Sequence, residues 1–194
     1  LSRALDCVRR NWVVSFAPVA YGIGLSIVGT LAAPLGIIGG FLYSLASAAC
    51  ASSALFLIKN MVESGKTDVR DFLNGFTVYI WEVITIGFIL SIPTWALATG
   101  LAGVPNGPLI FFLVKLGLYI ILNAVPELIY QSRVSGLELI GASYNFIVEN
   151  WIEWLIPNIL LFAVGYAVLE LIEPVLFGLP GFVALFLYAF IVGL

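Results

Sequence analysis

The sequence contains no histidine and only two cysteines among its 194 residues. Without histidine, neither a Ser–His nor a Cys–His catalytic pair can form, and the HExxH zinc motif is excluded. No glycine-rich phosphate loop of the GxxxxGK type occurs either. We expect no disulfide, because Cys7 lies near one predicted membrane face and Cys50 lies within an apolar run, and two cysteines at this spacing predict no metal site. These absences predict a protein that is not an enzyme and that binds no metal and no cofactor.

Charged residues are also scarce, at 10% of the chain, against about 25% in soluble proteins. Hydrophobic residues make up 62% of the sequence, and apolar runs fill nearly its whole length. This composition cannot cover a water-soluble surface, so we expect an integral membrane protein. The eight Lys and Arg residues form no basic patch, which argues against nucleic acid as a partner.

A tryptophan that begins an apolar run, followed by a turn built on Leu, Pro and Gly, occurs three times. The tryptophans are spaced 69 and 70 residues apart, at Trp12, Trp81 and Trp151. The turns begin 70 residues apart, at Leu31, Leu101 and Leu171. A shared period indicates an internal repeat. We therefore predict one membrane domain over 1–194, with repeats at about 1–64, 65–133 and 134–194.

Each repeat contains two apolar segments that we interpret as membrane-spanning helices. The six predicted spans are about 12–32, 35–58, 77–98, 108–130, 150–172 and 179–194. Short amphipathic segments at 1–11, 67–77 and 131–149 each precede a span and are predicted to be interfacial helices. In the second segment Thr67 is the expected N-cap. The apolar faces of the second and third segments are Val69, Phe72, Leu73 and Phe76, and Leu137, Ile140, Tyr144 and Ile147.

The second predicted span is rich in small residues from Ser44 to Ala54. Small residues let helix backbones approach closely in lipid, where packing drives association. We therefore expect this helix at the centre of the bundle. Gly36 and Gly40 add a GxxxG pair, a pattern that apolar glycine-rich segments often contain by chance.

The distribution of positive charge predicts the orientation of the spans. Seven of the eight Lys and Arg residues lie in the N-terminal segment and the two long loops, and none lies in the Pro/Gly turns. The positive-inside rule then places both termini and the long loops in the cytoplasm. All three hairpins point the same way, which makes the repeat parallel rather than inverted. The expected fold is an all-α, polytopic bundle of six spans in three hairpins, with cytoplasmic interfacial helices.

Three stretches carry a resemblance to a known group of proteins: 4–12, 69–81 and 135–151, each an amphipathic segment that leads to a tryptophan. Together they resemble the prokaryotic six-helix membrane domains of largely unknown function, which include the membrane domain fused to some glycerophosphodiester phosphodiesterases. The resemblance implies a location in the prokaryotic cytoplasmic membrane. It carries over no functional residue, because the phosphodiesterase active site belongs to a separate soluble domain.

Polar residues within the spans are the candidate functional residues, because burying charge in a membrane is costly. They are Lys115, Glu82, Asn123, Asn158 and Glu170. Lys115 either extends toward the membrane surface or pairs with Glu170 or Glu173. The alternative role for Lys115 is to form a substrate, ion or Schiff-base site. Nothing in the sequence places a serine beside it to form a Ser–Lys dyad.

For the other candidates the alternatives are equally open. Glu82 is either an interfacial carboxylate or a proton or cation site, and we expect no direct pair between Glu82 and Lys115. Inter-helix hydrogen bonding would account for Asn123 and Asn158.

Two functional hypotheses follow from these residues. The first is a non-enzymatic membrane protein, a scaffold, accessory subunit or lipid-contacting domain, whose partners are membrane lipid and either another protein or further copies of itself. The second is a small-solute or lipid transporter with its site near Lys115, Asn123 and Asn158. Loss of ligand binding in a folded Lys115→Ala variant would favour the transporter.

Overall fold

The computed structural model describes residues 11–132, 134–177 and 183. Every regular element in these residues is helical, as predicted, and none is a strand. The chain forms two compact units, Leu1–Ile80 with Leu160–Leu194, and Trp81–Ile159. The predicted interfacial helix at 1–11 and the predicted span at 179–194 lie almost entirely outside the described residues.

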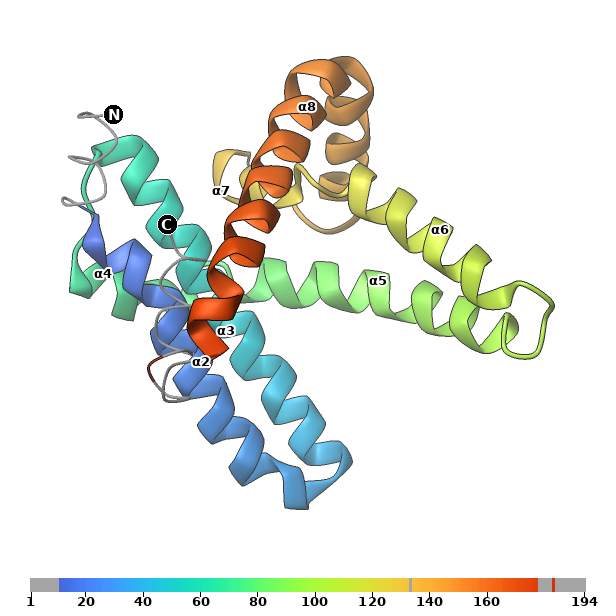
Figure 1. Ribbon diagram of the computed structural model, residues 1–194, viewed down its shortest axis with the longest axis horizontal. Helices are drawn as coiled ribbons and strands as arrows, with labels where there is room; N and C mark the ends of the chain where they lie inside the picture. The colour runs from blue at the N-terminus through green and yellow to red at the C-terminus, as the bar shows by residue number, and fades with distance from the viewer. Residues whose placement is uncertain (1–10, 133, 178–182, 184–194) are drawn as a thin grey trace. The chain divides into compact units, whose positions relative to one another are not determined.

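Helices α2 (Trp12–Ala32) and α3 (Ile37–Ser64) run side by side as a hairpin in the first unit (Figure 1). A short 3-10 turn, η1 (Ala33–Leu35), joins them and contains Pro34. Gly36 then takes a φ of 57°, a left-handed conformation that glycine adopts without steric cost. The helices predicted at 12–32 and 35–58 are confirmed. The second continues to Ser64, because no glycine is available to end it before Gly65, whose φ is 69°.

Helix α4 (Val69–Asn74) and the 3-10 turn η2 (Gly75–Thr77) occupy the predicted amphipathic segment at 67–77. The prediction of Thr67 as N-cap is wrong, because Asp68 takes that position. The Asp68 carboxylate accepts the Val69 N–H at 2.7 Å, and the Asp71 carboxylate accepts the Asp68 N–H at 2.9 Å. The hydroxyl of Thr67 instead donates to the side-chain oxygen of Asn11 at 3.1 Å.

The second unit begins with α5 (Ile80–Gly100), whose first residue still belongs to the first unit, and α6 (Gly107–Ile121). The two helices meet at the turn 101–106 and separate from it toward their other ends (Figure 1). The turn ends on Asn106 with a φ of 60°. The predicted spans at 77–98 and 108–130 are thus helical, but the second is not continuous.

A break at Leu122–Ala124 separates α6 from α7 (Val125–Gln131). Pro126 explains the break, because a proline ring clashes with the carbonyl four residues earlier and lacks an N–H. That carbonyl belongs to Leu122, which accepts the Val125 N–H at 3.0 Å instead. The predicted span at 108–130 therefore consists of two helices, within one stretch, Gly107–Gln131, that is long and apolar enough to cross a membrane.

Helix α8 (Gly136–Phe177) contains one non-helical residue, Asn150, with a φ of −125° and a ψ of 28°. This kink lies at the predicted boundary between the segments 131–149 and 150–172. The turn expected from Leu171 is wrong, because the helix continues through Phe177. In the other two turns, Gly36 and Asn106 take a positive φ. The residue 70 positions after Asn106 is Leu176, and leucine disfavours a positive φ.

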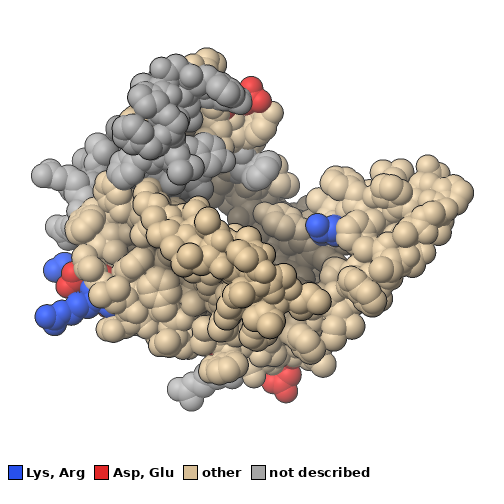
Figure 2. Space-filling view, turned by 90° about the horizontal axis from the view of Figure 1, so that it is seen from below, with Lys and Arg blue, Asp and Glu red and all other residues tan. Residues whose placement is uncertain are grey.

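Within the described residues, five helical stretches are long and apolar enough to cross a membrane. They are Trp12–Leu35, Ile37–Ser64, Ile80–Gly100, Gly107–Gln131 and Gly136–Ile172. Their large apolar side chains are widely exposed; Ile37, at 94%, is an extreme case. Figure 2 shows that most of the face in view is formed by uncharged residues, with charged atoms confined to small groups. These features are those of a multi-pass membrane protein.

Candidate functional site

The Lys115 side chain is exposed in the middle of α6. Its ammonium nitrogen lies 5.6 Å from the centre of the Phe111 ring, one turn earlier. This is the range of a cation–π contact, which stabilises an exposed lysine by about 0.5–1 kcal/mol. The predicted pairing with Glu170 or Glu173 stays a prediction, since the Glu173 side chain lies outside the described ones.

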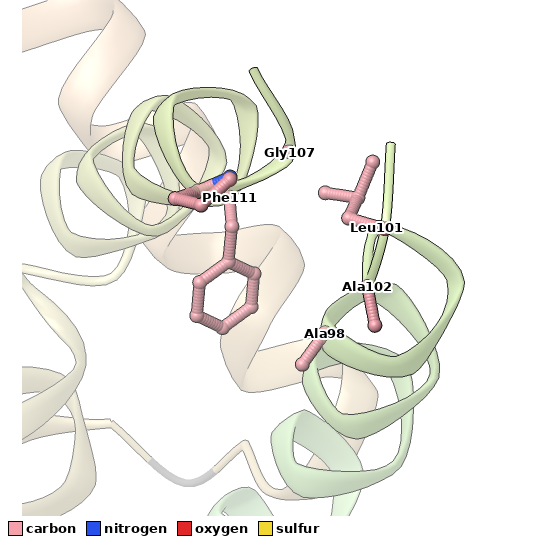
Figure 3. A pocket seen from close by; sticks show the side chains of 7 residues that line it. Ala98, Leu101, Ala102, Gly107 and Phe111 are labelled. Carbon is pink, nitrogen blue, oxygen red and sulfur yellow. The ribbon is translucent and has the colours of Figure 1, made fainter. Parts of the chain in front are cut away.

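A small apolar pocket lies one turn from Lys115, where α5 and α6 meet (Figure 3). Its volume is about 270 Å³. The Phe111 side chain projects from α6 into the space beside Ala98 of α5 and Ala102 of the turn that follows it (Figure 3). The lining contains no charged or hydroxyl side chain. The pocket therefore offers an apolar surface with a single nearby cation.

Asn123 lies in the break between α6 and α7, where its backbone N–H donates to the Ile120 carbonyl at 3.3 Å. The carbonyl of Ile121, which would bond to Val125 in a continuous helix, accepts the hydroxyl of Ser143 from α8 at 2.6 Å. Ser143 is fully buried. The polar link at this break is therefore made by Ser143, which sequence reasoning missed.

Two polar side-chain atoms of the second unit are buried without a hydrogen-bond partner in the described part of the chain: Glu127 Oε2 and Trp154 Nε1. Glu127 lies in the first turn of α7. The ring of Trp154 meets Phe146 edge to face, with 5.2 Å between ring centres. The sequence pattern did not single out Trp154, and the position of Glu127 near the end of the fourth predicted span indicated an interfacial carboxylate.

The remaining predicted residues make local contacts. The amide of Asn158 donates to the Trp154 carbonyl of its own helix at 2.7 Å, rather than to a second helix as expected. Glu170 accepts the hydroxyl of Tyr166, one turn away, at 2.5 Å. Glu82 is half-buried in the first turn of α5. Lys115 and Asn123 are eight residues apart, about 12 Å along a helix axis.

The densest polar network lies in the first unit, between α3 and the segment formed by α4 and η2. The Ser52 hydroxyl donates to the Gly75 carbonyl at 2.6 Å and accepts the Tyr79 N–H at 2.8 Å. The Ser53 hydroxyl donates to the Phe72 carbonyl at 2.8 Å and accepts the Tyr21 hydroxyl at 2.9 Å. Both serines are fully buried.

Aromatic packing reinforces this network. The rings of Tyr21 and Phe72 stack with 5.4 Å between their centres, and Phe76 meets both edge to face. Gly75 is required beside α3, because a Cβ there would lie 2.9 Å from the Ser53 Cα. The predicted apolar face of α4 thus divides: Phe72 and Phe76 pack on Tyr21, whereas Val69 and Leu73 are exposed.

The predicted apolar face at 131–149 divides in a similar way. Leu137 and Tyr144 are exposed, whereas Ile147 is buried together with Leu139 and Ser143. No group of three or more Cys, Asp or Glu residues within the described ranges could hold a metal ion.

Comparisons with models of protein families, with curated protein sequences and with solved structures found no match. The class of the protein therefore follows from its own features. It is an all-helical protein with several helices suited to cross a membrane.

Proposed function

We propose that this chain is a non-enzymatic integral membrane protein that acts as a scaffold or accessory subunit, or through its contacts with lipid. In this proposal the protein is a six-helix domain of the prokaryotic cytoplasmic membrane, like the domains fused to some glycerophosphodiester phosphodiesterases. Its termini and long loops are cytoplasmic, and its three hairpins are parallel repeats.

One observation carries the proposal: buried polar side chains of the chain form hydrogen bonds with its own backbone. Ser52, Ser53 and Ser143 each donate to a carbonyl of another element, and Asn158 donates within its own helix. The outer faces of the spans are apolar and exposed. These hydrogen bonds therefore hold the helices of each unit together, and the surface that remains for contact with other molecules is apolar.

Contacts one period apart support the repeat. Gly36 and Asn106 are 70 residues apart, and both take a φ close to 60° directly before the returning helix. The Ser53–Phe72 contact joins a returning helix to the next amphipathic segment. The Ser143–Ile121 contact does the same one repeat later, within two residues of the equivalent positions. The amphipathic segments at 67–77 and 131–149 are thus each bonded to the span before them.

Native mass spectrometry of the protein, extracted gently from its own membrane, tests the proposal. We expect a second protein, further copies of the chain, or retained lipid to remain bound, because the apolar faces need a partner. A lone chain that retains one water-soluble small molecule and none of these partners would contradict the proposal.

The apolar pocket beside Lys115 favours a second candidate, a small-solute or lipid transporter. In that case Lys115→Ala would lose the small molecule detected by mass spectrometry while remaining folded. Lys66→Ala is the matched control, because Lys66 is an exposed lysine outside the predicted spans. Unchanged binding in Lys115→Ala would remove Lys115 from the transport hypothesis.

A further inference from the structure

The amino-terminal part of α2 and the helix α4 line an apolar groove in the first unit. Its volume is about 180 Å³. The lining residues are Trp12, Val13, Phe16, Ala17, Ala20, Val69 and Phe72. Trp12 and Val69 are still 52% and 45% exposed, so the groove can receive an apolar group without any change in the fold.

Two basic residues flank α4, the helix that forms one side of this groove. Arg70 follows the lining residue Val69, and Lys66 comes just before the helix; both are exposed. Neither forms an ion pair with any residue that the structure describes. The neighbouring carboxylates, Asp68 and Asp71, already accept the backbone N–H groups at the start of α4. The charge on Arg70 is therefore available to a ligand.

The distribution of charge along the sequence points to the same end of the hairpin. Residues 1–74 contain six Lys and Arg against four Asp and Glu, whereas residues 75–194 contain two against seven. Arg9 and Arg10 directly precede Asn11 and Trp12. Lys and Arg residues are thus more frequent in the part of the sequence that contains α2 and α4 than in the remainder.

We propose that the groove between α2 and α4 binds an anionic phospholipid. The upper part of an acyl chain lies against Trp12, Phe16 and Val69, and Arg70 binds the headgroup phosphate. Tryptophan favours the depth of the headgroups in a bilayer, and the arginine fork matches the geometry of phosphate oxygens. The inference rests on the proposed orientation of α4 at the cytoplasmic surface, where anionic lipids attract basic segments.

The test is a lipid titration of the purified full chain, monitored by native mass spectrometry. The probes are dioleoyl phosphatidylglycerol and dioleoyl phosphatidylcholine, which have the same acyl chains and differ in net charge. We expect tighter binding of phosphatidylglycerol, and a loss of about fivefold in that affinity for Arg70→Gln. This corresponds to the roughly 1 kcal/mol that one basic residue contributes near an anionic surface. We expect Ala20→Phe, which fills the groove from an exposed position, to weaken binding of both lipids.

Lys59→Gln is the matched control, because it removes a positive charge from α3 at a position that does not line the groove. Equal losses for Lys59→Gln and Arg70→Gln would overturn the proposal in favour of a diffuse electrostatic effect. Equal binding of the two lipids by the unmodified chain would also overturn it, as would a protein bound in the groove that is lost in Ala20→Phe. A protein bound in the groove would contradict the lipid proposal and still support the accessory-subunit function. The experiment therefore distinguishes failure of the lipid proposal from failure of the proposed function.

Discussion

Ser52 joins three segments of the chain through one hydroxyl group. It lies in α3, donates to the Gly75 carbonyl of η2 and accepts the N–H of Tyr79, just before α5. Because the side chain is fully buried, no water replaces these bonds when the hydroxyl is removed. The contribution of Ser52 to stability therefore depends on the two backbone groups that it bonds.

We expect Ser52→Ala to lower the free energy of unfolding by about 1–3 kcal/mol, the cost of leaving buried backbone groups unpaired. Unfolding in detergent micelles by titration with a denaturing detergent measures the change. Ser44→Ala is the control, because the exposed Ser44 hydroxyl bonds only to Gly40 of its own helix and should change stability by less than about 0.5 kcal/mol. Equal effects would contradict the role given to Ser52.

Lys115→Ala is expected to change the free energy of unfolding by less than about 1 kcal/mol, because its described contact is a cation–π contact at an exposed site. The same unfolding titration measures it. A larger loss would mean that Lys115 has a buried ionic partner, such as the predicted Glu170.

At the scale of elements, two glycines of the first hairpin differ sharply although they are neighbours. A Cβ on Gly39 would lie 1.9 Å from the Ala32 carbonyl oxygen, whereas a Cβ on Gly40 would meet nothing within 4 Å. Gly39 therefore permits the close return of α3 beside the end of α2. Gly40, half of the predicted GxxxG pair, makes no such approach within the described chain.

We expect Gly39→Ala to destabilise the protein by about 1–3 kcal/mol, as overpacking does in a tight contact. Gly40→Ala should be neutral or stabilise by up to about 1 kcal/mol, because alanine favours the helix. Thermal unfolding of the two variants, compared with the unmodified chain, measures the difference. A loss of stability or of self-association in Gly40→Ala would instead show that Gly40 contacts another copy.

The sequence predicts most of the described helices but only some of their interruptions. Apolar length and the positions of Trp12, Pro34 and Asn150 indicate where helices begin, turn or kink. The break before Pro126 was missed because the surrounding residues are as apolar as a span. The turn expected at Leu171 was wrong because the pattern of Leu, Pro and Gly does not show which residue must take a positive φ.

The candidate site was predicted less well than the fold. Lys115, Asn123 and Asn158 were chosen for their polarity, yet they lie on separate turns and bond locally or not at all within the described chain. Ser52, Ser53 and Ser143 were overlooked because serine in a small-residue helix indicates packing. Their partners are backbone carbonyls, which every residue carries, so no sequence pattern marks them.

At the scale of the whole molecule, the two units share one design, a helical hairpin with an amphipathic segment bonded to the returning helix. The parallel repeat requires both outer turns on one side of the membrane and both amphipathic segments on the other. The scaffold proposal and the lipid groove both depend on that arrangement, because it places the basic residues near α4 at one membrane surface.

Topology mapping by cysteine labelling is the most direct test of this arrangement. In a background with Cys7 and Cys50 replaced by serine, single cysteines at Leu35 and Val104 mark the two outer turns, and cysteines at Lys66 and Gln131 mark the opposite ends. We predict that a membrane-impermeant thiol reagent labels Leu35→Cys and Val104→Cys in intact cells, and labels Lys66→Cys and Gln131→Cys only after permeabilisation. Labelling of Leu35→Cys and Val104→Cys from opposite sides would contradict the parallel repeat.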